Sequence, residues 1–218
     1  AEDMRSLDQE GRAALRRLGV RFGAYHVFIP SLIKPAPASL ITLLWALHND
    51  GKDKLGFGDI VHALASGRTS MVVNQSFDKE FYRLAGYRNL GRRAVRVDIL
   101  ERLADLIRPA INWKPGLGRR PDGAYDGQSF MVTPAMLSIL GATPDDMEEI
   151  LKGLGYRAEA RPEGEVKAGL EEIDAAAKAA AAAKAAAVEA ATASGETREN
   201  AGEEGGTDRS AEASGMSD

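Results

Sequence analysis

Five arginines that fall within 14 residues are the strongest candidate for a chemical role in this sequence. They are Arg83, Arg88, Arg92, Arg93 and Arg96, and Tyr82 and Tyr87 lie among them. Guanidinium groups pair with phosphates in a bidentate manner, and aromatic rings stack on the bases of single strands. The cluster therefore predicts a site for single-stranded nucleic acid, provided that its members share one open face. The structural alternative is an ordinary solvated face of a helix.

Two further basic groups have the same character but less density. One is formed by Arg12, Arg16, Arg17 and Arg21, and the other by Arg119 and Arg120 with Trp113 and Tyr125 nearby.

Catalytic and metal-binding patterns are missing from the sequence. It has no Gly-x-x-x-x-Gly-Lys-Ser/Thr loop for phosphates and no acidic box for magnesium. It has no cysteine, and the spacing of His26, His48 and His62 is not that of metal ligands. We therefore expect no catalytic residue, no metal site and no cofactor in this chain, and no ATP hydrolysis by the chain alone.

Residues 136–154 have the spacing of a helix–turn–helix, with Gly141 in the turn. The second helix, however, carries Asp145, Asp146, Glu148 and Glu149 against Lys152 alone, and such acidity repels phosphates. This segment is therefore expected to pack a core rather than to contact DNA.

Helix signals dominate the chain, and the predicted fold class is mainly α (α+β) with short strands. Asp98 with Glu101 has the pattern of a capping box, and the following helix is expected to stop at Pro109. Thr133-Pro134 and Thr143-Pro144 predict two further helix starts.

Segment 39–47 is apolar on nearly every side and predicts a buried central helix. Segment 112–128 is rich in Gly, Pro, Arg and Asp and predicts an exposed loop.

A short repeat indicates how the elements are organised. Gly19-Val20-Arg21, Gly86-Tyr87-Arg88 and Gly155-Tyr156-Arg157 each follow a helix-like segment, and after the first two the pattern continues as strand and helix. Glycine commonly ends a helix in the left-handed conformation. The repeat predicts winged-helix-like modules within residues 1–157, with possible sub-modules 1–75 and 76–157.

The last third of the chain differs in composition. Residues 158–218 hold 14 acids and 6 bases, and 14 of the 19 residues from Ala175 to Ala193 are alanine. Because the whole chain has a net charge of −4, residues 1–157 carry +4. The composition predicts a solvated alanine helix without an apolar stripe, and an acidic, disordered segment from Ser194 onward.

Six short segments carry a family resemblance. Segments 18–23, 27–35 and 43–47, together with 93–103, 130–136 and 154–157, resemble the C-terminal region of bacterial ATP-dependent DEAD/DEAH-box helicases of the alphaproteobacterial type. These are related to the RNA helicase of the mitochondrial degradosome. The resemblance covers roughly residues 5–157, and an Ala/Lys-rich tail is also usual there.

The resemblance implies a parent enzyme that hydrolyses ATP with Mg²⁺ and unwinds RNA or RNA–DNA hybrids. Both nucleotide motifs would then lie in a motor that precedes Ala1, and this chain would be the accessory region behind it. Its expected partners are its own motor domains and, with low affinity, single-stranded RNA. The tail is acidic where the family pattern is basic, so it is not expected to bind nucleic acid.

Two other functions fit the same residues. A protein-interaction scaffold would show evenly mixed charge on its folded surface, and a stand-alone DNA-binding regulator would need a basic recognition helix. The longest apolar run lies within 35–47 and is too short to span a bilayer, and no secretory signal is visible. A cytoplasmic location without membrane contact is therefore expected.

Overall fold

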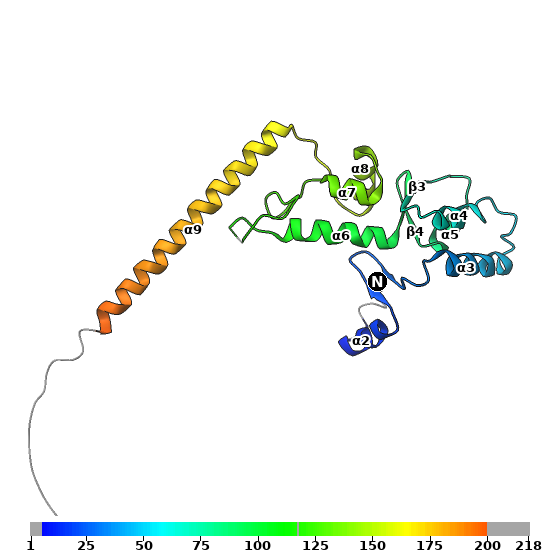
Figure 1. Ribbon diagram of the computed structural model, residues 1–218, viewed down its shortest axis with the longest axis horizontal. Helices are drawn as coiled ribbons and strands as arrows, with labels where there is room; N and C mark the ends of the chain where they lie inside the picture. The colour runs from blue at the N-terminus through cyan, green and yellow to red at the C-terminus, as the bar shows by residue number, and fades with distance from the viewer. Residues whose placement is uncertain (1–5, 117, 200–218) are drawn as a thin grey trace, which may run out of the picture.

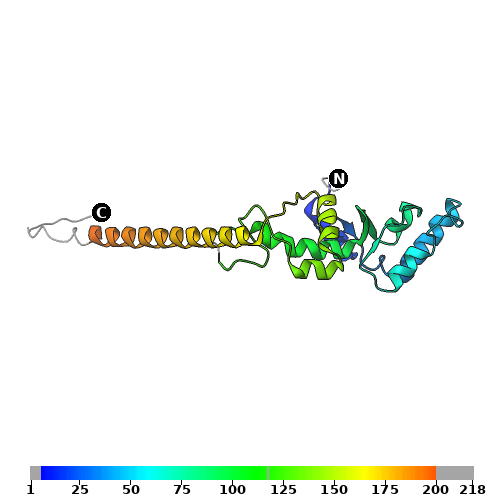
Figure 2. The same cartoon turned by 90° about the horizontal axis from the view of Figure 1, so that it is seen from above.

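The computed structural model describes residues 6–116 and 118–199, with side chains as far as Ala187. Helices predominate and the strands are short and antiparallel, which confirms a mainly α (α+β) fold. Figures 1 and 2 show the helices and strands gathered in one elongated body, from which the last helix, α9, projects.

The N-terminal part is a capped helix followed by a hairpin. Helix α2 (Gln9–Arg17) begins at Asp8, whose carboxylate accepts from the Gly11 amide (2.7 Å). Strand β1 (Arg21–Phe22) pairs with β2 (Val27–Phe28) in antiparallel register. The turn between them, 23–26, lies against helix α6 and takes part in the site described below.

The middle part packs three helices against a three-stranded sheet of order β3-β5-β4. The elements are α3 (Pro35–His48), α4 (Asp59–Ala65), β3 (Ser70–Val72), α5 (Lys79–Leu84), β4 (Tyr87–Leu90) and β5 (Arg93–Arg96). Their shared core is aromatic and includes Phe81, Tyr82 and Tyr87 with Ile60 and Leu64.

The prediction that segment 39–47 forms a buried central helix is wrong. Helix α3 does form there, but only its small residues Ala38, Thr42 and Ala46 are buried. Its leucines face outward, and both views place α3 at the end of the body remote from α9 (Figures 1 and 2). The residue types predicted a helix correctly, but only its small side chains are fully buried against the rest of the middle part, with Trp45 half-buried beside them.

The second core is formed by helices α6 (Val97–Asn112), α7 (Pro134–Leu140) and α8 (Pro144–Gly153). Its fully buried side chains are aliphatic or Met and include Leu100, Leu103, Ile107, Met136, Leu140, Met147 and Ile150. Thr133 and Thr143 cap α7 and α8 as predicted, and Gly141 ends α7 in the left-handed conformation.

Two expectations about α6 are wrong. Asp98 and Glu101 form no capping box, because the helix begins at Val97 after Arg96, and Glu101 turns away to the 23–26 turn. Pro109 does not stop the helix, which continues to Asn112. A proline ends a helix only when its missing donor and its ring cannot be accommodated, and here the last turn tolerates both.

The repeat predicted from three Gly-x-Arg segments is confirmed as a local feature. Gly19, Gly86 and Gly155 all have positive φ values, of 88°, 80° and 99°. The first two each lead from a helix into a strand, whereas Gly155 leads from α8 into an extended segment.

Helix α9 (Glu163–Glu199) is more closely attached than its composition predicts. Val166, Leu170 and Ile173 are half-buried and lie on one face, at helical spacing. Arg120, in the loop between α6 and α7, forms an ion pair with Asp174 of the helix (2.6 Å). The expectation that this segment has no apolar stripe is therefore wrong for its first three turns.

The loop before α7 is also less exposed than predicted, because Trp113 and Ala124 are buried in a small cluster of their own.

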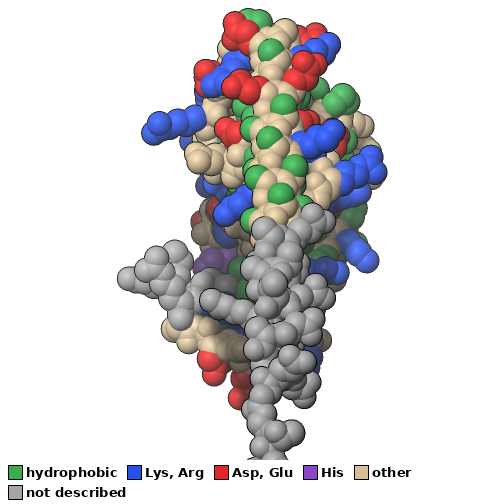
Figure 3. Space-filling model, turned by 90° about the vertical axis from the view of Figure 1, so that its left-hand side faces the viewer, with side chains coloured by type: hydrophobic (Ala, Val, Ile, Leu, Met, Phe, Trp, Pro, Cys, Tyr) green, Lys and Arg blue, Asp and Glu red, His purple; other side chains and the backbone are tan. Residues whose placement is uncertain are grey.

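Charges of both signs are interspersed along the part of α9 nearest the loop before α7, and the middle of α9 is lined by alanine (Figure 3). The helix continues beyond Ser194 to Glu199, where disorder was expected, and the acidic segment 200–218 lies outside the described residues.

Candidate nucleic-acid interface

The five predicted arginines lie on one short stretch of structure but do not share one surface. Arg83 ends helix α5, Arg88 is in β4, Arg92 is in the tight turn after Gly91, and Arg93 and Arg96 are in β5. Strands β4 and β5 pair in antiparallel register, with Leu90 opposite Arg93. The hairpin thus carries the arginines in two directions, toward helix α8 and toward the 23–26 turn.

Arg92 and Arg93 clamp the hairpin to helix α8. Arg92 Nε donates to Glu149 Oε1 (2.8 Å), and Arg93 donates to Asp146 Oδ2 (3.2 Å) and to Ser70 Oγ (2.6 Å). The side chain of Arg93 is only 15% exposed. These two guanidinium groups are committed to intramolecular partners, and two of the acids on α8 are the other half of the clamp.

Arg96 is likewise committed. Its Nε donates to Asp98 Oδ1 (2.6 Å) and its terminal nitrogen to Oδ2 (2.9 Å). This bidentate pairing raises the pKa of the Arg96 guanidinium, against the opposing effect of burial. The pair joins the end of β5 to the first turn of α6 and leaves little of Arg96 for a ligand.

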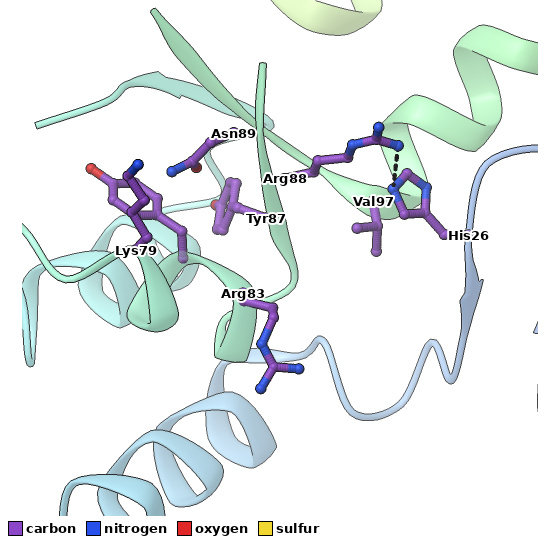
Figure 4. Close-up of a pocket in the computed structure, with 8 residues that line it drawn as sticks. His26, Lys79, Arg83, Tyr87, Arg88, Asn89 and Val97 are labelled. Atoms are coloured by element: carbon purple, nitrogen blue, oxygen red, sulfur yellow. Dashed lines mark hydrogen bonds between the residues drawn. The ribbon is translucent and has the colours of Figure 1, made fainter. Parts of the chain in front are cut away.

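The remaining two arginines line an open pocket of about 340 Å³ next to α5 and β4 (Figure 4). The pocket is lined by His26, Lys79, Tyr82, Arg83, Tyr87, Arg88, Asn89 and Val97. None of these eight side chains is acidic, so the pocket favours an anion. Arg83 reaches it while paired with Glu80 one turn earlier on α5.

Lys79 and Arg88 are the cations of the pocket that no carboxylate neutralises. Within the described part of the chain, the Lys79 ammonium forms no ion pair, and the only side-chain partner of Arg88 is the ring of His26 (3.3 Å). Figure 4 shows Arg88 reaching from β4 toward His26, with Lys79 and Asn89 grouped farther along the pocket. Two uncompensated cations in one pocket make a site for phosphate groups.

Glu101 holds His26 in place. Its carboxylate accepts hydrogen bonds from the amides of Ala24, Tyr25 (3.0 Å) and His26 (2.8 Å), and Nδ1 of His26 donates to it as well (3.0 Å). Because Nδ1 carries the proton, Nε2 is free to accept from Arg88. Glu101 thus sets the position of Arg88 through the imidazole, from a helix 75 residues away in sequence.

The tyrosines do not offer stacking faces, and this part of the sequence-based prediction is wrong. Tyr82 is 1% exposed and Tyr87 is 3% exposed. The Tyr87 hydroxyl donates to the carbonyl oxygen of Arg68 (2.6 Å), and burial raises the pKa of this phenol to about 12. Both rings belong to the core, so the pocket is suited to phosphate groups rather than to stacked bases.

Three residues of the pocket escaped the sequence reasoning: Lys79, Asn89 and His26. Lys79 stands between Asp78 and Glu80 in a run with a net charge of −1, so it was not counted with the basic cluster. Its spacing to Arg83 nevertheless places both residues on one face of a helix. The side-chain oxygen of Asn89 is buried without a hydrogen-bond partner in the described structure. No sequence signal pointed to Asn89.

Among the described residues there is no group of three potential metal ligands, and no helix has the length and hydropathy to cross a bilayer. Comparison with known protein families, with curated proteins and with solved structures gave no match for this chain.

Proposed function

We propose that this chain is the C-terminal accessory region of an ATP-dependent RNA helicase, and that it guides single-stranded RNA by binding its phosphates. The helicase assignment rests on the resemblance of the apolar segments described above. ATP and Mg²⁺ would be bound by the motor domains outside this chain, and the protein would act in the cytoplasm.

The observation that carries RNA binding is the pocket with two uncompensated cations, Lys79 and Arg88. Arg83 lies at its rim with its side chain 71% exposed, but its charge is paired with Glu80. An open pocket admits a flexible strand, and ammonium and guanidinium groups recognise phosphate without reading the bases. The proposed contact is therefore weak, salt-dependent and independent of sequence.

Of the five predicted arginines, the proposal keeps Arg88 as an uncompensated cation and adds Lys79. The other four, Arg83, Arg92, Arg93 and Arg96, each pair with a carboxylate and are not counted among the phosphate-binding cations. A stand-alone DNA-binding regulator gains no support, because α8 presents no basic face: Asp145 and Glu148 are exposed on it beside Lys152 alone.

The test compares two double variants with the same change of charge. Lys79→Gln with Arg88→Gln removes the two pocket cations, and Arg17→Gln with Lys52→Gln removes two exposed cations elsewhere. Fluorescence anisotropy with a labelled single-stranded RNA at low salt should show binding weakened about tenfold by the first pair and less than about twofold by the second.

Circular dichroism of both variants checks that they remain folded. Equal binding by the two double variants, or no binding by the parent at low salt, would reject the RNA-guiding proposal.

A further inference from the structure

Helix α3 is apolar on two opposite faces. The inner face presents Ala38, Thr42 and Ala46, all buried against the rest of the middle part. The outer face presents Leu40, Leu43, Leu44 and Leu47, which are 56%, 41%, 56% and 50% exposed. The sequence-based expectation of a helix buried all round reflected both faces, but the described chain covers only one of them.

The outer leucines have the spacing of a helix-packing seam. Positions i, i+3, i+4 and i+7 form one continuous stripe, which is the pattern of contacts between paired helices. No charged residue lies between Pro35 and Leu47, so nothing on the helix keeps this face solvated. An uninterrupted apolar stripe on a surface marks an interaction site.

We propose that the leucine stripe of α3 docks on the same stripe of a second copy of this chain, with the two helices antiparallel. The stripe is symmetric about the midpoint between Leu43 and Leu44. A twofold axis there pairs Leu40 with Leu47 of the second copy, and Leu43 with Leu44. A surface that matches itself under a twofold rotation is what an isologous dimer requires.

The charges at the ends of α3 favour the same arrangement. Lys34 stands immediately before the helix, and Asp50, Lys52 and Asp53 follow its end with a net charge of −1. All four are exposed and form no ion pair within the described residues. An antiparallel pair brings each Lys34 toward the net negative end of the other copy and opposes the two helix dipoles, whereas a parallel pair would place Lys34 beside Lys34.

The location and extent of the stripe determine the strength expected. It lies at the end of the body remote from α9, where a second copy meets no obstruction from that helix (Figures 1 and 2). One helix face is smaller than the ~800 Å² that each partner buries in a standard stable interface. The dimer should therefore be weak and form reversibly.

Sedimentation velocity over a concentration series measures the association directly. The full chain should shift from monomer to dimer, and Leu43→Glu with Leu44→Glu should remain monomeric at every concentration. The matched control is Leu18→Glu with Val72→Glu, which changes two apolar side chains outside the stripe. These side chains are 76% and 69% exposed, and the control variant should dimerise as the parent does. A parent that stays monomeric, or a dimer that survives the Leu43 and Leu44 changes, overturns the proposal.

Cysteine cross-linking tests the orientation, because the chain has no cysteine of its own. In the antiparallel pair, Leu40→Cys chains mixed with Leu47→Cys chains should form mixed disulfides. Two Leu40→Cys chains should not cross-link. In the antiparallel pair, position 40 of one copy lies opposite position 47 of the other, so the two cysteines are seven residues, or ~10 Å, apart along the axis, beyond the reach of a disulfide. Self-cross-linking of Leu40→Cys would instead indicate a parallel pair and reject the arrangement.

The outcome is independent of the proposed RNA site. The Leu43 and Leu44 changes leave Lys79 and Arg88 in place, and dimerisation is measured without RNA. Failure to dimerise with intact RNA binding rejects only the docking surface, and the reverse result rejects only the RNA site.

Discussion

At the scale of single residues, the most consequential side chain is Glu101. Its carboxylate gathers three consecutive backbone amides and the imidazole of His26, and its side chain is only 12% exposed. Gly23 is required at the approach, because a Cβ at that position would overlap the carboxylate. One acid thereby attaches the N-terminal hairpin to α6 and orients a cation of the proposed site.

Replacing Glu101 by Ala should destabilise the fold by about 2–4 kcal/mol, because two partly buried amides and one exposed amide lose a charged acceptor. Urea denaturation measures the change. The control is Glu148→Ala, which removes an exposed i,i+4 pair with Lys152 and should cost at most about 0.5 kcal/mol. Equal midpoints for the two variants would mean that the 23–26 turn is held by other contacts.

The stabilisation of helix α5 by Asp78 should depend on pH. It caps α5, and the Glu80 amide (3.0 Å) and the Lys54 ammonium (2.9 Å) both donate to its carboxylate. These hydrogen bonds hold the pKa of Asp78 below its ordinary value of 3.8. A depressed pKa means that the stabilisation is present above pH 3.8 and is lost as the pH falls through the lower, folded-state value.

Asp78→Ala should therefore destabilise the protein by about 1 kcal/mol at neutral pH, with a smaller difference in acid. Thermal melts of parent and variant from pH 7 down to pH 2 test this. A difference that stays constant or grows on acidification would contradict the assignment of the cap. Asp78→Asn keeps an acceptor at the cap without a titrating group and serves as the control.

At the scale of elements, helix α3 carries packed and exposed apolar side chains next to each other in the sequence. Trp45 is half-buried and meets Phe81 edge to face, with ring centroids 5.5 Å apart. The Lys54 ammonium lies over its other side, 5.1 Å from the ring centre. Leu44, its neighbour in sequence, is more than half exposed.

Trp45→Ala should consequently cost about 2–3 kcal/mol, whereas Leu44→Ala should cost about 0.5 kcal/mol or less. Both are measured by denaturation at submicromolar concentration, so that association does not contribute. A helix buried on every side, as the sequence predicted for segment 39–47, would give large losses for both residues. A large loss for Leu44 would place α3 back in the core.

Removal of helix α9 by truncation should lower the thermal stability of the protein. Half-burial of Val166, Leu170 and Ile173 is worth about 1 kcal/mol each, partly offset by the cost of ordering the helix. Ending the chain after Arg161 should lower the Tm by about 3–6 °C. Ending it after Ala180 keeps the contacts and should leave the Tm within about 1 °C. Equal melting of both truncations would show that α9 does not dock.

At the scale of the whole molecule, the number of free cations sets the salt dependence of RNA binding. Lys79 and Arg88 together can contact one or two phosphates. The logarithm of the binding constant should then fall with the logarithm of salt with a slope of about −0.7 to −1.4. The five arginines of the sequence-based site would give about −3.5 by the same rule. Anisotropy titrations at four or more salt concentrations distinguish the two, and a slope near zero would contradict both.

Much of the fold was predictable from short segments. Thr133-Pro134 and Thr143-Pro144 opened helices where expected, and Gly19, Gly86 and Gly155 took the left-handed conformation. These features depend on steric limits and hydrogen bonds among residues fewer than five apart. The fold class and the strongly helical Ala-rich segment follow from the same local rules.

The candidate site was predictable only as a region. Arg83 and Arg88 do line the pocket, but the sequence did not separate them from Arg92, Arg93 and Arg96. The separation depends on where acids lie in space, and Glu149 is 57 residues from Arg92. Tyr82 and Tyr87 were misjudged for a similar reason, since their burial depends on Ile60, Leu64 and Phe81.

By itself, then, the sequence determined where α7 and α8 begin, the charge of each part, and the position of the basic cluster along the chain. Tertiary structure decided which face of α3 is covered, which cations are neutralised, and that Glu101 serves the 23–26 turn instead of its own helix end. The physical reason is one of range. Backbone preferences act over a few residues, whereas burial and ion pairing depend on partners that only the folded chain brings together.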